Sequence, residues 1–208
     1  MNTLRTFAHT LLLATLLPTT ACAQEGGTSA KEENPGYFHG GLNLQLSSVR
    51  RSVGSVRPRV SRPGIILGLG SEFFFGNYVA ERFRFGMNMG WFSLDASFGD
   101  GVTSVALQTL KPGFLFSAKA SEKLRVDFKY SLLPTIGANI FTDDLDDADG
   151  NFFWGTPHGP YLGITYGKFM AGLEYMAGTL HVIEDDDSNL FYDRYAANTL
   201  RVLVGINY

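Results

Sequence analysis

The chain has 208 residues, a formal net charge of −3, 24 glycines, 17 phenylalanines and one cysteine. The slight acidity argues against nucleic acid as a partner, because binding to phosphates requires an excess of lysine and arginine. Beyond the N-terminal region no segment approaches the ~20 continuous apolar residues of a membrane helix, so only strands could cross a bilayer. The glycine and aromatic content is typical of many strands joined by tight turns.

The N-terminal residues have the features of an export signal. One arginine at position 5 precedes an apolar run from Leu11 to Leu17, and small residues around Cys22 form a cleavage site. We expect cleavage after Ala23, which removes Cys22 and leaves no cysteine for a disulfide. Processing at Cys22 as a lipoprotein is the alternative, although Thr19 stands where such sites normally carry leucine.

The first half of the remaining chain predicts four strands. Alternation of apolar and polar residues, which is the side-chain period of a strand, covers residues 37–47, 64–75, 82–95 and 103–117. In the fourth strand the alternation changes phase near Thr109, where we expect a bulge. The first connection, at 48–61, carries four arginines and no carboxylate: Arg50, Arg51, Arg57 and Arg59.

The clearest strand covers residues 123–139. Its even positions, from Leu124 to Ala138, are apolar, whereas its odd positions from Lys123 to Ser131 are charged or polar. A strand in a soluble domain is usually ~5–6 residues long, whereas a tilted strand that crosses a bilayer needs ~9–11. The length and alternation together predict one strand of a transmembrane β-barrel.

The second half continues the pattern after a long loop at 141–157. We expect strands at 158–166 and 169–182, then a last strand that ends at Tyr208. Two acidic clusters, at 143–149 and 184–187, are separated by these strands. The first lacks the alternate acidic positions of an EF-hand before Gly150, so we interpret both as solvated loops rather than metal sites.

The connections sort by length in the way that is typical of bacterial outer-membrane barrels. They are short after strands two, four and six and long after strands one, five and seven, as expected for tight periplasmic turns and longer external loops. We therefore predict an all-β fold, an eight-stranded antiparallel up-and-down transmembrane β-barrel. The chain then divides into a signal peptide (1–23), a flexible periplasmic lead-in (24–35) and an outer-membrane barrel domain (36–208).

Aromatic residues gather at one end of the predicted strands. Membrane interfaces favour such girdles. With both termini periplasmic, the aromatics at the periplasmic end are Phe38, Phe73, Phe75, Phe83, Phe85, Phe114, Phe116, Tyr166, Phe169 and Tyr208. A soluble lipocalin-like barrel has the same strand count with the apolar face inside. So many aromatics at one end would not fit such an interior, so we favour the membrane barrel.

The sequence resembles the small outer-membrane β-barrel family, of the OmpA/OmpX type and the porin-like group. The resemblance is carried by GGLNLQL at 40–46, PGIILGLGSEFFF at 63–75, KPGFLFSAKASEKLRVDFKY at 111–130 and the ending LRVLVGINY. It implies the fold, a location in the bacterial outer membrane and recognition of the C-terminal aromatic by the barrel-assembly machinery. It implies no particular activity.

The polar face of the strands predicts what fills the barrel. An eight-stranded barrel has an interior only wide enough for side chains, so we expect a paired network of charges rather than an open pore. Glycines at inward positions would leave room for long lysine and arginine side chains. The predicted network comprises Glu72, Arg84, Lys111, Arg125, Asp127, Lys129, Glu174 and Arg201.

We expect a structural or surface-interaction role without catalysis and without a cofactor. A narrow passive channel is the alternative, followed by an enzyme that modifies lipid A, in which a histidine would activate a serine hydroxyl. The histidines of the expected barrel are His39, His158 and His181, and none has a serine within two residues.

The basic first loop suggests what lies outside the barrel. Its four arginines share an external rim with the acidic loops, so they pair across the mouth or hold phosphates of lipopolysaccharide. The expected partners are therefore outer-membrane lipid, lipopolysaccharide and, during biogenesis, the assembly machinery.

Overall fold

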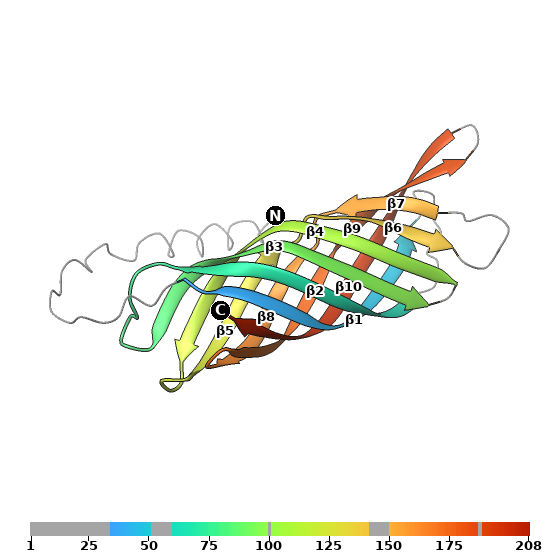
Figure 1. Ribbon diagram of the computed structural model, residues 1–208. Helices are drawn as coiled ribbons and strands as arrows, with labels where there is room; N and C mark the ends of the chain where they lie inside the picture. Colours follow the sequence, from blue (N-terminus) through green and yellow to red (C-terminus); the bar gives the residue numbers. More distant parts are fainter. Residues whose placement is uncertain (1–33, 51–59, 100, 142–149, 187–188) are drawn as a thin grey trace, which may run out of the picture. The chain divides into compact units, whose positions relative to one another are not determined.

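Ten antiparallel strands make up the barrel domain in a computed structural model that describes residues 34–50, 60–99, 101–141, 150–186 and 189–208 (Figure 1). Within these ranges no helix is long and apolar enough to span a membrane. The strands are β1 (Gly36–Arg50), β2 (Val60–Phe74), β3 (Phe83–Gly99), β4 (Val102–Lys119), β5 (Leu124–Leu132), β6 (Thr135–Phe141), β7 (Gly150–Gly155), β8 (His158–Tyr166), β9 (Phe169–Asp186) and β10 (Asn189–Asn207).

The sheet closes on itself as a ring of eight crossings. β10 pairs with both β1 and β9, and β4 pairs with β5 over its second half and with β6 over its first half. β5 with β6 therefore makes one crossing, and β7 with β8 makes the next. The first and last strands are joined to the end, since the backbones of Gly36 and Tyr208 exchange hydrogen bonds of 3.0 and 2.8 Å. The predicted eight-stranded antiparallel barrel is confirmed.

A seam interrupts two neighbouring crossings at the same level. The predicted continuous strand at 123–139 is wrong at Leu133 and Pro134, which separate β5 from β6, and Pro157 lies in the equivalent break between β7 and β8. Proline has no N–H to donate to a ladder. The Leu133 N–H still reaches the Pro157 carbonyl at 2.7 Å, and the pairing register is the same on both sides of the seam.

Several predicted boundaries are also wrong. The loop expected at 141–157 contains β7, which forms one crossing of the wall together with β8. Its side chains alternate as in a strand, since Asn151 and Phe153 face inward while Phe152 and Trp154 face outward. The loop expected at 48–61 is shortened at both ends by β1 and β2. Long strands are favoured here because backbone groups in a bilayer must be satisfied by their neighbours.

A paired bulge changes the phase of β3 and β4. Trp91 of β3 and Leu110 of β4 lie opposite each other as extra residues between regular pairs of the ladder. Both are exposed, and Leu110 has a φ of 51°. The bulge predicted near Thr109 is confirmed one residue further on, and β3 has a counterpart that the sequence did not predict. Odd positions of β3 face outward before Trp91, and even positions do so after it.

The wall has apolar side chains outside and polar side chains inside. Outward residues remain exposed on every crossing, and they include Leu42, Ile65, Phe85, Phe128, Ile164, Leu173 and Val204. Monomeric soluble proteins rarely expose an apolar surface that continues around the whole molecule, whereas a lipid bilayer solvates it. The lipocalin-like alternative is therefore wrong, and the chain is a transmembrane barrel.

Short connections mark the periplasmic end. Residues 75–82, 120–123 and 167–168 join strands at the end where the barrel domain begins and finishes, and bacterial barrels have their tight turns on that side. The outward aromatics of the predicted girdle lie there, from Phe38 on β1 to Tyr208 after β10. The opposite end, called external below, carries the connection at 142–149.

Candidate functional site: the barrel lumen

All eight charged residues of the predicted network lie inside the barrel. They come from six strands: Glu72 on β2, Arg84 on β3, Lys111 on β4, Arg125, Asp127 and Lys129 on β5, Glu174 on β9 and Arg201 on β10. Inward positions of a closed wall face one another across a narrow space. The residues form two clusters, one near the periplasmic end and one at mid-height.

The periplasmic cluster is built on two carboxylates. Glu72 accepts hydrogen bonds from Arg125 and, at 2.8 Å, from the Lys129 ammonium. The Arg125 Nε group also donates to Asp127 at 3.0 Å. Hydroxyl groups complete the hydrogen bonding of the second carboxylate, because Ser117 and Thr165 donate to Asp127 at 2.6 and 2.7 Å. Both buried carboxylates are thus fully engaged by cations and donors, as stable buried charges require.

Aromatic rings surround the cations of this cluster. The Lys129 ammonium lies 4.7 Å from the Tyr37 ring centroid and 5.0 Å from that of Tyr161. The Arg84 guanidinium lies 4.1 Å from the Phe74 ring centroid. Cations over ring faces at such distances are attracted by the ring quadrupole, an effect that grows when water is excluded. The cluster is therefore held by charge and by aromatic packing together.

The mid-height cluster links three strands through Arg201. Its guanidinium donates to Glu174 at 3.0 Å and to Asp95 at 2.9 Å, forming two ion pairs. Lys111 pairs with the other oxygen of Glu174, and the Asn43 amide donates to Asp95. Two cations and two anions therefore balance in this cluster.

Asp95 is a charged residue of the lumen that sequence reasoning missed. Unbroken alternation along β3 would place it on the lipid side, but the extra residue Trp91 turns it inward. A signal was present in the sequence, since the apolar positions change from odd to even between Met89 and Leu94. Two adjacent aromatics, Trp91 and Phe92, mark the change.

Inward glycines make room chiefly for rings, which corrects the expectation that they accommodate lysine and arginine. A Cβ on Gly163 or Gly172 would lie within 2.5 Å of atoms of the Tyr161 side chain. One on Gly70 would lie 2.4 Å from the Tyr37 ring. Lys111, beside Gly90, is the case that follows the expectation. These inward glycines therefore leave the space that neighbouring aromatic rings occupy in the lumen.

Apolar side chains fill the lumen toward the external end. Phe153, Leu180 and Val182 form a buried cluster with Ala106 and Ala197, and Leu133 and Met176 are about 1% exposed nearby. A cavity of about 30 Å³ lies between this apolar layer and Arg201. Such a volume accommodates only one or two water molecules. The predicted charged network therefore occupies part of the lumen, and an apolar cluster lies nearer the external end beside buried polar residues such as Ser104 and Asn151.

The three histidines of the barrel have different surroundings. His39 is buried in the lumen and stacks on Tyr37, while the neighbouring Ser93 donates its hydroxyl to Gln108. His158 is hydrogen-bonded to the Tyr130 hydroxyl at 2.7 Å on the outer wall. His181 stacks on Trp154. In the part of the chain that the structure describes, no serine hydroxyl is hydrogen-bonded to any of them, as activation of a nucleophile would require.

The loop predictions fall mostly outside the described residues. Arg51, Arg57, Arg59 and the acidic cluster at 143–149 lie there, whereas Arg50 ends β1 as the ladder partner of Arg194. The acidic residues at 184–186 belong to β9, so that part of the second predicted acidic loop is strand. Among the described side chains, no three histidine, cysteine, aspartate or glutamate residues are grouped to hold a metal ion.

The fold and the filled lumen define a class, the small closed β-barrels of bacterial outer membranes. Neither a protein-family model nor a curated protein sequence matches the chain. Among solved structures the fold is similar to the attachment invasion locus protein Ail of Yersinia pestis in complex with sucrose octasulfate, with 11% identity, a TM-score of 0.44 and coverage of 85% of this chain and 99% of Ail.

Two further structures have comparable similarity. The outer membrane protein OprG of Pseudomonas aeruginosa is 10% identical with a TM-score of 0.43, covering 85% of this chain and 96% of OprG. The outer membrane protease OmpT of Escherichia coli is 7% identical with a TM-score of 0.44, covering 84% of this chain and 96% of OmpT. The class assignment rests on the closed ring and the inverted polarity of the wall.

Proposed function

We propose that this protein is a closed outer-membrane barrel with a structural or surface-interaction role, and that it does not conduct solutes. The observation that carries the proposal is the double obstruction of the lumen. A charged layer spans the ring from Glu72 to Arg201, and an apolar layer centred on Phe153 lies beyond it, with a cavity of about 30 Å³ between them. A hydrated ion would have to disrupt both layers in sequence.

The external end supports a role at the surface. β9 and β10 extend past the neighbouring strands, so that within the described residues 184–186 and 189–191 pair only with each other. A bilayer-crossing strand needs ~9–11 residues, whereas these strands have 18 and 19. The paired backbone of this hairpin therefore extends past the neighbouring strands at the external end, where another molecule could contact it.

Planar-bilayer recording tests the closed lumen. The purified mature protein should show no resolved conductance steps, because the charged and the apolar layer both obstruct the lumen. The double variant Phe153→Ala/Met176→Ala is the matched comparison, since it removes apolar volume and leaves the charged layer in place. It should also remain silent. Adding Arg201→Ala, which opens the charged layer as well, should produce steps.

Regular, ohmic steps from the unmodified protein would contradict the proposal and favour the narrow channel. Heat-modifiable gel migration should accompany each recording, because it reports whether a variant has formed a barrel. The enzymatic alternative is tested separately by mass spectrometry of lipid A from cells that express the protein. A changed number of acyl chains would contradict a non-catalytic role.

A further inference from the structure

The strand stagger produces an oblique row of side chains on the outer wall. A path through facing residues leaves β1 at Gly40, passes through Leu67, Leu94, Leu107, Ile136, Trp154, His181 and Arg194, and returns to β1 at Arg50. The return point lies ten residues nearer the external end than the start. Such a shift is the shear of a closed barrel with tilted strands. The row therefore climbs from the middle of the wall toward the external membrane surface.

The chemistry of this row changes as it climbs. Leucine and isoleucine come first, Trp154 follows, and His181 and Arg194 come last. Trp154 is half-exposed, and its ring stacks on His181 with centroids 4.6 Å apart and an interplanar angle of 20°. Tryptophan prefers the interface between hydrocarbon and headgroups. Arg194 is exposed one strand beyond His181, so it lies at the level of the headgroups.

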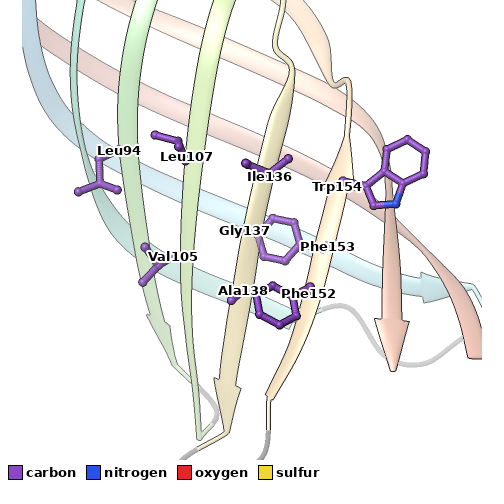
Figure 2. A pocket seen from close by; sticks show the side chains of 9 residues that line it. All are labelled: Leu94, Val105, Leu107, Ile136, Gly137, Ala138, Phe152, Phe153 and Trp154. Carbon is purple, nitrogen blue, oxygen red and sulfur yellow. The ribbon is translucent and has the colours of Figure 1, made fainter. Parts of the chain in front are cut away.

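An apolar hollow of about 580 Å³ adjoins the row on its external side (Figure 2). Gly137 and Ala138 of β6 form its floor, Val105 and Leu107 of β4 line one side, and Phe152 of β7 lines the other. Small residues create the hollow, because Ala138 sits between two larger ladder partners, Val105 and Phe152. The hollow faces lipid, since Ile136 and Phe152 are exposed on the same outer face.

A lipid with an anionic headgroup matches this arrangement. Lipid tails are as apolar as the wall, so retention of a particular lipid depends on fit to a shaped surface and on its headgroup. The hollow offers shape, and Arg194 offers a guanidinium that can bind a phosphate through two hydrogen bonds.

We infer that this outer surface, formed by the hollow and by Trp154, His181 and Arg194, binds one lipid A moiety of lipopolysaccharide. One acyl chain lies in the hollow over Ala138, and a phosphate lies beside Arg194. The assignment to lipid A follows from the external position of the cationic end, because that leaflet of the outer membrane carries lipopolysaccharide. The site is on the lipid side of the wall and is independent of whether the lumen conducts.

Native mass spectrometry of the mature barrel in detergent, titrated with purified bisphosphorylated lipid A, tests the inference. Arg194→Gln removes the cation, and Ala138→Leu fills the hollow. Arg194→Gln removes a charge-assisted hydrogen bond, so it should weaken lipid A binding about tenfold or more. Ala138→Leu should also weaken it. Dephosphorylated lipid A should bind equally weakly to the unmodified protein and to Arg194→Gln.

Matched controls use the same chemical changes elsewhere on the outer surface. Lys168→Gln removes a cation from a periplasmic turn, and Ala171→Leu enlarges an exposed outward alanine of β9. Both should bind lipid A as the unmodified protein does. Unchanged binding by Arg194→Gln and Ala138→Leu, with intact barrels by gel migration, would overturn the site. Phosphatidylglycerol bound as tightly as lipid A would overturn the choice of ligand.

Discussion

The charged and apolar halves of the lumen are filled by different kinds of side chain. In the periplasmic and middle parts of the lumen, Glu72, Asp127 and Glu174 are each held by cations or hydroxyl groups. Toward the external end, Phe153 and Leu180 pack with Val182 in an apolar cluster. The charged half depends on complete pairing, because a buried charge without a partner is costly. The apolar half depends on volume, because its cost arises from cavities.

The largest effect is expected in the charged half. Glu174→Leu leaves Lys111 and Arg201 without their shared carboxylate. Breaking a buried pair in this way should lower the free energy of unfolding by about 3–5 kcal/mol. Guanidinium unfolding of the barrel in lipid vesicles measures the change, with Glu81→Gln in an exposed turn as the control. A loss no larger than that of the control would show that the pairing contributes little.

A smaller effect is expected in the apolar half. Leu180→Ala removes volume beside Phe153 and Val182, and it should lower the free energy of unfolding by about 2–3 kcal/mol. This value is in the lower part of the range for leucine truncations, because the adjacent cavity lets neighbouring side chains relax. The same unfolding measurement applies, and Thr179→Ala, on the outward side of β9, serves as its comparison. If Leu180→Ala cost more than Glu174→Leu, the proposed contrast between the halves would be reversed.

The smallest effect concerns the link between the two halves. Asp95→Asn keeps the shape of the side chain but weakens its bond to Arg201, and it should cost about 1–2 kcal/mol. Ser97→Ala, on the same face of β3, removes a neutral hydrogen bond of 3.1 Å to Gln45 and should cost less, about 0.5–1 kcal/mol. Equal costs in unfolding titrations would mean that the Asp95 charge adds nothing to the mid-height cluster.

Alternation made the charged half predictable from the sequence. On β5, charged or polar residues from Arg125 to Ser131 alternate with apolar ones, so the face of each side chain follows from its position alone. The ring itself could be predicted because eight such segments are separated by connections of alternating length. The contacts among Glu72, Arg125 and Lys129 follow once the strands are neighbours in a narrow barrel.

The apolar half could not be predicted in the same way. Where β9 carries Met176, Leu180 and Val182 inward, both faces of the strand are largely apolar, so alternation no longer distinguishes lumen from lipid. β7 was missed for a similar reason, since Phe152, Phe153 and Trp154 are consecutive aromatics next to an acidic run. Knowledge of the partners in the ladder was needed to assign their faces.

Phase changes account for the remaining error. Asp95 lies inside because Trp91 adds a residue to β3, and a bulge depends on the backbone of both strands rather than on one local pattern. The matching extra residue, Leu110, was anticipated on β4 alone. Comparing the two strands as a hairpin, rather than one at a time, would have revealed that both shift together.

The proline seam divides two adjacent crossings into two blocks, which the hydrogen bond from Leu133 to Pro157 joins. Below it β5 is bonded to β8, above it β6 is bonded to β7, and Pro134 and Pro157 supply no amide proton between them. Opening of one block therefore does not require the other to open, as in the cooperative units detected by amide hydrogen exchange. The external block of this wall can therefore open while the periplasmic block stays closed.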